Sequence, residues 1–100
     1  MGFGQLYRDG RLVYCGDWRN GLFDGWGRMY FPDTSLIRSY NGKWRQGYAS
    51  GSGSIFFWNN DKFMGTLLDS EIRGDGTYYR NNLAVHCGYW ENNRLVQAEA

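Results

Sequence analysis

Apolar and polar residues alternate with a period of two along most of the chain. The clearest case is an aromatic-x-Gly-x-Trp segment that runs from Tyr14 to Trp18. Side chains two positions apart share one face of a strand, whereas an amphipathic helix needs apolar residues at i, i+3, i+4 and i+7, a pattern that the chain does not carry. The alternation therefore predicts an all-β fold.

A fourfold internal repeat organises this alternation. Gly-x-Gly begins at Gly2, Gly25, Gly51 and Gly74, with spacings of 23, 26 and 23 residues. An aromatic residue stands five positions after each start, at Tyr7, Tyr30, Phe56 and Tyr79. The sequence predicts an array over residues 1–96, with repeats at about 2–24, 25–50, 51–73 and 74–96 and a tail at 97–100. We place the three extra residues of the second repeat in a turn around residues 32–35.

Each repeat is predicted to form a β-hairpin. In the first, strands from Gly4 to Arg8 and from Arg11 to Trp18 flank Asp9-Gly10, a dipeptide favoured in tight turns whose central residues both need positive φ. We expect Asn59-Asn60 and Asn81-Asn82 to serve in later repeats. The result would be a single-layer antiparallel sheet of about four successive hairpins, an elongated and twisted meander. Residues 95–100 are expected to begin a short helix.

One segment carries a family resemblance. The run from Tyr14 to Gly21, which reads Tyr-Cys-Gly-Asp-Trp-Arg-Asn-Gly, is followed by Gly25-Trp26-Gly27 and resembles the MORN (membrane occupation and recognition nexus) repeat. The resemblance covers about residues 2–96, although Leu67 replaces the Trp in repeat three and His86 replaces the Tyr in repeat four. It implies a grooved sheet of hairpins. It also implies non-catalytic roles in ciliary and cytoskeletal scaffolds, at membrane junctions, or in modules attached to enzymes.

The charge balance argues against nucleic acid and anionic membranes as partners. The chain has 11 Lys and Arg against 10 Asp and Glu, and no two basic residues are adjacent. No stretch approaches the roughly 18 apolar residues of a membrane span. Cys15 and Cys87 would lie about 29 Å apart in the predicted sheet, too far for a disulfide, and free thiols favour an intracellular location.

The sequence predicts no catalytic residue, metal site or cofactor. His86 is the only histidine, and it occupies the repeat position of Tyr14, Tyr40 and Phe63, where we expect it to pack as a flat ring. Gly-x-Gly pairs can bind phosphates, but no helix is predicted to follow any of them. The acidic residues Asp69, Glu71 and Asp75 fall between the third and fourth repeats, where we expect a solvated loop.

Aromatic residues that the repeat does not require are the best candidates for partner contact. Phe3, Trp26 and Trp58 are predicted on one face of the sheet, and Tyr89 is a similar addition in the fourth repeat. Phe31 and Phe57 are predicted on the opposite face. A single-layer sheet has no second layer to cover such rings, so either the sheet curls over them or a partner does.

These features predict a non-catalytic scaffold or protein–protein interaction module within a larger intracellular assembly, of cytoplasmic, cytoskeletal or axonemal type. The first strand is expected to be an open edge that accepts a neighbour. The alternatives are a peripheral membrane adaptor that binds phosphoinositides through Arg8, Arg11 and Arg80, and a regulatory repeat module of a larger enzyme.

Overall fold

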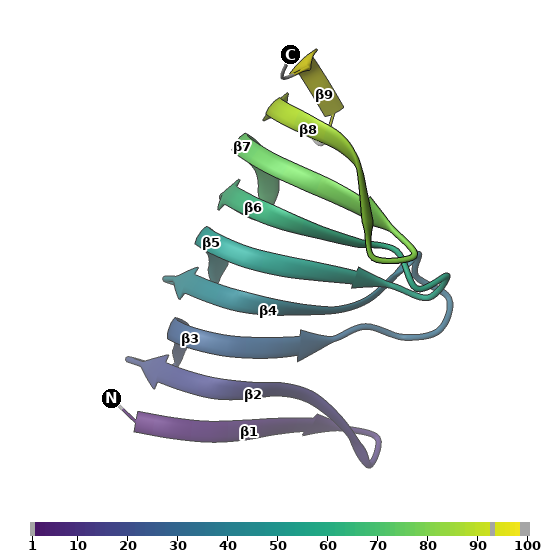
Figure 1. Cartoon of the computed structure of the whole chain (residues 1–100). Helices are drawn as coiled ribbons and strands as arrows, with labels where there is room; N and C mark the ends of the chain where they lie inside the picture. Colours follow the sequence, from purple (N-terminus) through teal and green to yellow (C-terminus); the bar gives the residue numbers. More distant parts are fainter. Residues whose placement is uncertain (1, 93, 99–100) are drawn as a thin grey trace.

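The computed structural model describes residues 2–92 and 94–98, which form one antiparallel sheet of nine strands (Figure 1). Each strand pairs with the next one in the chain, so the sheet is a continuous meander with β1 and β9 at its edges. The strands are β1 (Gly2–Arg8), β2 (Arg11–Arg19), β3 (Leu22–Tyr30), β4 (Ile37–Arg45), β5 (Tyr48–Phe57), β6 (Lys62–Leu68), β7 (Glu71–Arg80), β8 (Leu83–Glu91) and β9 (Arg94–Ala98). The predicted all-β, single-layer fold is confirmed.

Tight turns with left-handed residues join most of the strands. Asp9 and Gly10 have φ values of 52° and 79°, as the predicted hairpin turn requires. Asn81 and Asn82 also have positive φ, at 52° and 65°. At the third hairpin only Asn60 does, with φ 72°, because the turn between β5 and β6 is longer. The extra residues of the second repeat lie in the connection between β3 and β4, as predicted.

A row of glycines crosses the middle of the sheet. Eight successive strands each place one glycine directly opposite the next, namely Gly4, Gly16, Gly27, Gly42, Gly53, Gly65, Gly76 and Gly88. Aromatic rings lie over this row. A Cβ added at Gly27 would come within 2.6 Å of Cε1 of Tyr14, and Gly53 and Gly76 are covered in the same way by Tyr40 and Phe63. In the last three Gly-x-Gly pairs, the second glycine therefore makes room for a ring from the preceding strand.

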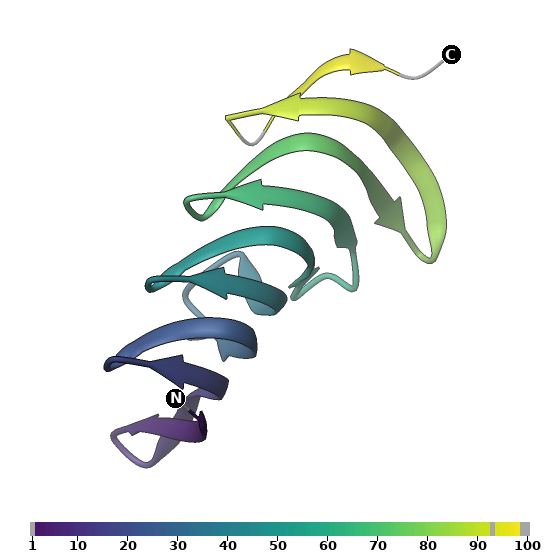
Figure 2. The same ribbon diagram turned by 90° about the vertical axis from the view of Figure 1, so that its left-hand side faces the viewer.

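The first glycine of Gly-x-Gly has a different role. Gly25, Gly51 and Gly74 have φ values of 108°, 101° and 106°, a conformation that residues with a side chain rarely adopt. Each lies where the register shifts, so that one residue of the preceding strand faces three residues of the next. Such bulges bend a strand and increase its twist. The hairpins are visibly bent along their length in Figure 2.

The rings on one face of the sheet form the core. Tyr14 and Phe63 are fully buried, and Tyr14 stacks on Phe23 with ring centroids 4.0 Å apart. Trp44 also packs here, and its Nε1 donates a hydrogen bond to the Gly27 carbonyl at 3.1 Å. We call this the ring face and the opposite side the open face. Since residues 2–92 and 94–98 form a single sheet, the full burial of these rings places the ring face on the inner side of the bend.

Two expectations are wrong. His86 is exposed instead of packed like Tyr14, although it occupies the same repeat position and lies opposite Tyr78. The buried rings lie over a glycine of the next strand, whereas β9 pairs only with the end of β8 from Gly88 onward. The expected short helix is also wrong over its described part, because Leu95 pairs with Trp90 in a ninth strand. Residues 99 and 100 lie outside the described part of the chain.

Candidate functional site

The open face carries four exposed aromatic side chains on its first three strands. Phe3 and Tyr7 extend from β1, and Trp26 and Tyr30 extend from β3. Gln5 lies between Phe3 and Tyr7 in β1, and Arg28 lies between Trp26 and Tyr30 in β3. Both are directly opposite Cys15 of β2, and side chains two positions apart share a face, so all four rings lie on the same face of the sheet. Their exposed fractions are 71%, 57%, 57% and 37%, respectively. We call these four residues the aromatic quartet.

Polar groups flank Trp26 within the quartet. Its backbone N–H donates to Oδ2 of Asp17 at 3.0 Å. On its other side, Nζ of Lys43 lies 5.6 Å from the ring centroid, within the range of a cation–π contact. Asp17 is also directly opposite Phe3, so one carboxylate separates the two most apolar members of the quartet. The site is therefore aromatic at its corners and polar between them.

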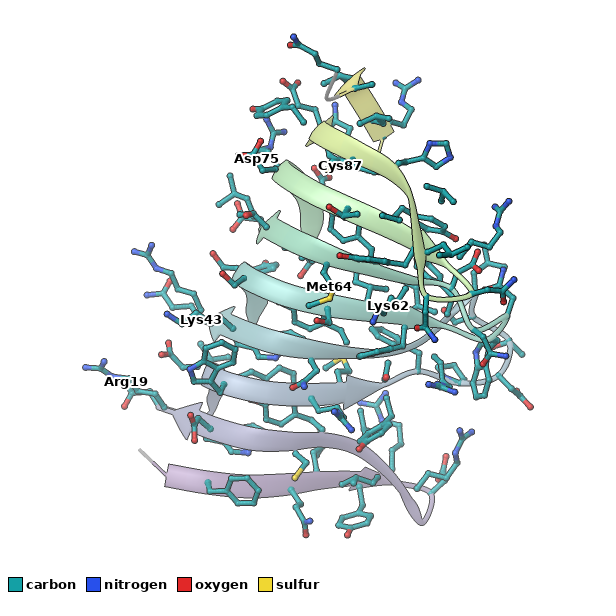
Figure 3. The ribbon with its side chains drawn as sticks, viewed as in Figure 1. Arg19, Lys43, Lys62, Met64, Asp75 and Cys87 are labelled. Atoms are coloured by element: carbon teal, nitrogen blue, oxygen red, sulfur yellow. The ribbon has the colours of Figure 1, made fainter. Side chains whose placement is uncertain are left out.

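The open face becomes more polar beyond β3. A shallow hollow of about 460 Å³ begins at Trp26 and continues over Ser52 and Ser54 to Met64. Figure 3 shows the labelled side chains of Lys43, Met64 and Cys87 on successive parts of the sheet, from β4 through β6 to β8. The aromatic quartet thus lies next to the β1 edge, and exposed apolar side chains such as Met64 and Tyr89 occur singly on later strands.

The six predicted contact residues fall in different places. Phe3 and Trp26 belong to the quartet, whereas Tyr89 lies on β8 and Trp58 in the turn between β5 and β6, with 40% and 46% of their surfaces exposed. Phe31 and Phe57 are half-buried against the core of the ring face. Tyr7 and Tyr30 are not among the predicted contact residues, because the repeat requires an aromatic residue at their positions. The alternation of side chains along each strand nevertheless predicts that Tyr7 shares a face with Phe3, and Tyr30 with Trp26.

The three arginines considered for lipid headgroups are not gathered. Arg8 and Arg11 are opposite each other at the end of the first hairpin. Arg80 ends β7, five strands from β2, which corresponds to about 24 Å at the usual strand spacing. Its Nε lies 3.7 Å from the carboxylate of the buried residue Asp61. No single headgroup can contact all three in this arrangement.

Buried tyrosines on the ring face are held neutral. Burial, followed by the nearby charge of Asp17, raises the pKa of Tyr14 to about 12. Burial also raises the pKa of Tyr40 to about 12. Both hydroxyls act as donors, to the carbonyls of Asp17 at 2.9 Å and Lys43 at 3.2 Å. These groups stabilise the repeat and face away from the aromatic quartet.

Other chemical features of the described chain are sparse. Among residues 2–92 and 94–98, no group of three or more His, Cys, Asp or Glu side chains could hold a metal ion. The same residues contain no helix long and apolar enough to cross a membrane. Cys15 and Cys87 lie on β2 and β8, six strands apart, and are not joined to each other.

The comparisons with known proteins add no assignment. No protein-family model matches the chain, and no curated protein matches it. The function is therefore argued from the open face and its residues.

Proposed function

We propose that this chain is a non-catalytic interaction module, a scaffold subunit or part of one, that binds other proteins through its open face. The observation that carries the proposal is the aromatic quartet of Phe3, Tyr7, Trp26 and Tyr30, which is exposed on a face without a second layer. Aromatic side chains dominate the hot spots of protein interfaces, particularly when polar groups surround them.

A protein partner suits this surface better than a strongly charged one. The net charge of the chain is +1, so long-range attraction to nucleic acid or anionic lipid is weak. The quartet and the hollow beside it expose apolar groups in one region, which is the usual mark of a protein-binding patch. The resemblance to MORN repeats supports an intracellular assembly of cytoskeletal or ciliary type as the setting.

Affinity capture with matched variants tests the proposal. The immobilised chain is incubated with an extract of its native source, alongside a Phe3→Ser/Trp26→Ser variant and a Leu36→Ser control. Leu36 is 86% exposed in the connection between β3 and β4, so it offers an apolar residue outside the quartet. We expect the double variant to lose a bound protein that the wild type and the control retain, with little change in thermal stability.

Identical binding by all three proteins would contradict the proposal. A parallel vesicle assay addresses the membrane alternative, using neutral vesicles and vesicles that contain phosphoinositide. Binding that needs the anionic lipid, weakens with salt and depends on Arg8 and Arg11 would favour the alternative.

A further inference from the structure

The outer edge of β1 is an unprotected sheet edge. β1 has no strand on its outer side among the described residues, and its seven residues include no Lys or Pro and only one charge, at Arg8. Natural edge strands are usually short or carry such residues, which discourage pairing with another chain. The opposite edge, β9, has five residues and begins with Arg94.

The junctions between repeats define what fits against a strand like β1. At the β2–β3 junction, Gly16 is opposite Gly27 and Tyr14 is opposite Met29, with the Tyr14 ring over Gly27. The same arrangement recurs at the two later junctions, where Tyr40 covers Gly53 and Phe63 covers Gly76. Each junction thus joins an aromatic-x-Gly strand to a Gly-x-apolar strand in one fixed register.

β1 is a Gly-x-apolar strand of this kind, but no aromatic-x-Gly strand pairs with its outer side in the part of the chain that the structure describes. Gly4 and Leu6 hold the places of Gly27 and Met29, but the three atoms nearest to a Cβ added at Gly4 all belong to Trp18, with Nε1 at 2.9 Å. A hollow of about 410 Å³ lies beside it, lined by residues that include Gly2, Gly4 and Trp18. Trp18 is only half-buried, whereas Trp44, at the same repeat position, is 7% exposed.

We propose that the β1 edge binds an extended protein segment that contains an aromatic-x-Gly motif. The segment would lie antiparallel to β1 with its glycine opposite Gly4 and its aromatic residue opposite Leu6, so that the ring covers Gly4 and Trp18. This surface uses backbone pairing at the edge and the ring face, whereas the quartet lies on the open face; Phe3 and Tyr7 share β1 with it, but Trp26 and Tyr30 lie on β3. The occupant is defined by the register that the chain repeats three times within its own sheet.

A peptide with the sequence of residues 11–19 is the probe, since this segment already makes the contact with β3. The labelled peptide is titrated with the whole chain under reducing conditions, and binding is followed by fluorescence polarisation and by the NMR shifts of β1 amides. We expect saturable binding at micromolar to millimolar concentration and shifts confined to β1 and Trp18. A peptide with Tyr14→Ala should bind at least about tenfold more weakly, because it lacks the ring.

Two variants of the chain form a matched pair. Gly4→Val fills the space for the ring and should weaken binding about tenfold or more. Gln5→Val adds the same side chain on the open face of the same strand and should leave binding unchanged. The quartet variant Trp26→Ser should also bind the peptide normally. A failure of peptide binding at the β1 edge can therefore be distinguished from a failure of protein binding through the quartet.

Three results would overturn the proposal: no saturable binding at millimolar peptide, equal binding of the Tyr14→Ala peptide, or full binding by a folded Gly4→Val chain. If Gly4→Val does not fold, the comparison of the two peptides on the unaltered chain decides the matter.

Discussion

Replacing Gly27 with alanine tests whether ring-over-glycine packing holds the sheet together. The new methyl group would lie 2.6 Å from Cε1 of Tyr14 and closer still to Cζ and the hydroxyl oxygen. Real side-chain carbons do not approach so closely. The ring must therefore leave its place against Phe23 and Trp44, together with its hydrogen bond to the Asp17 carbonyl.

The expected loss follows from the burial of the ring. Tyr14 is fully buried, and an aromatic side chain of this size buries roughly 150–250 Å², worth about 4–6 kcal/mol at about 25 cal/mol per Å². A displaced ring keeps part of its contacts, and alanine gains about 0.5–1 kcal/mol over glycine by restricting the unfolded chain. We therefore expect Gly27→Ala to lower the free energy of unfolding by about 2–4 kcal/mol, out of roughly 5–15 kcal/mol for a domain.

Urea unfolding followed by tryptophan fluorescence and circular dichroism measures this loss. A double-mutant cycle isolates the cause, because Gly27→Ala should be close to neutral once Tyr14→Ala has removed the ring. Gly4→Ala is the comparison within the same glycine row, where the new methyl group meets Nε1 of the half-buried Trp18 at 2.9 Å instead of a fully buried ring, and it should cost less than Gly27→Ala. An equal cost of Gly27→Ala with and without the Tyr14 ring would refute the reasoning.

Three further outcomes are expected on the ring face. Because burial raises the pKa of Tyr14 and Tyr40 from 10 to about 12, their neutral forms stabilise the fold fully below pH 10, and roughly 1–2 kcal/mol for each should be lost between pH 10 and 12 in urea titrations. Trp44→Phe removes the hydrogen bond to the Gly27 carbonyl and should cost about 1 kcal/mol by the same assay. Asp61→Ala removes the buried acceptor of the Asn59 amide and the Tyr78 hydroxyl. It should lower the free energy of unfolding by about 1–3 kcal/mol, which a lower thermal midpoint would report.

The strands and tight turns could be predicted because they depend on local pattern. The period of two around Gly16 needs only neighbouring residues, and Asp9-Gly10 needs only its own backbone preference. The same alternation predicted that the side chains of Phe3 and Trp26 lie on one face of the sheet. That the two rings stay exposed did not follow, because it depends on which way the sheet bends.

The bend itself depends on pairing between strands that a single repeat does not reveal. Asp17 faces three residues of β3, and the left-handed Gly25 absorbs the difference. His86 illustrates the same limit, since its own position fits the repeat but its burial depends on a glycine in the next strand. Leu95 pairs with Trp90 because an existing strand edge outweighs the weak helical preference of a few residues.

The separation of the two faces explains how a thin sheet can be stable and still present a binding surface. The rings of Tyr14, Tyr40 and Phe63 each fill the space above a glycine of the next strand, so these core contacts are made within the ring face and do not involve the open face. Substitutions at Trp26 and Phe3 can therefore change binding without removing core contacts, whereas substitutions at Gly27 or Tyr14 should lower the stability of the sheet. If a Trp26→Ser change lowered stability as much as Gly27→Ala, the open face would belong to the core and the proposed function would lose its basis.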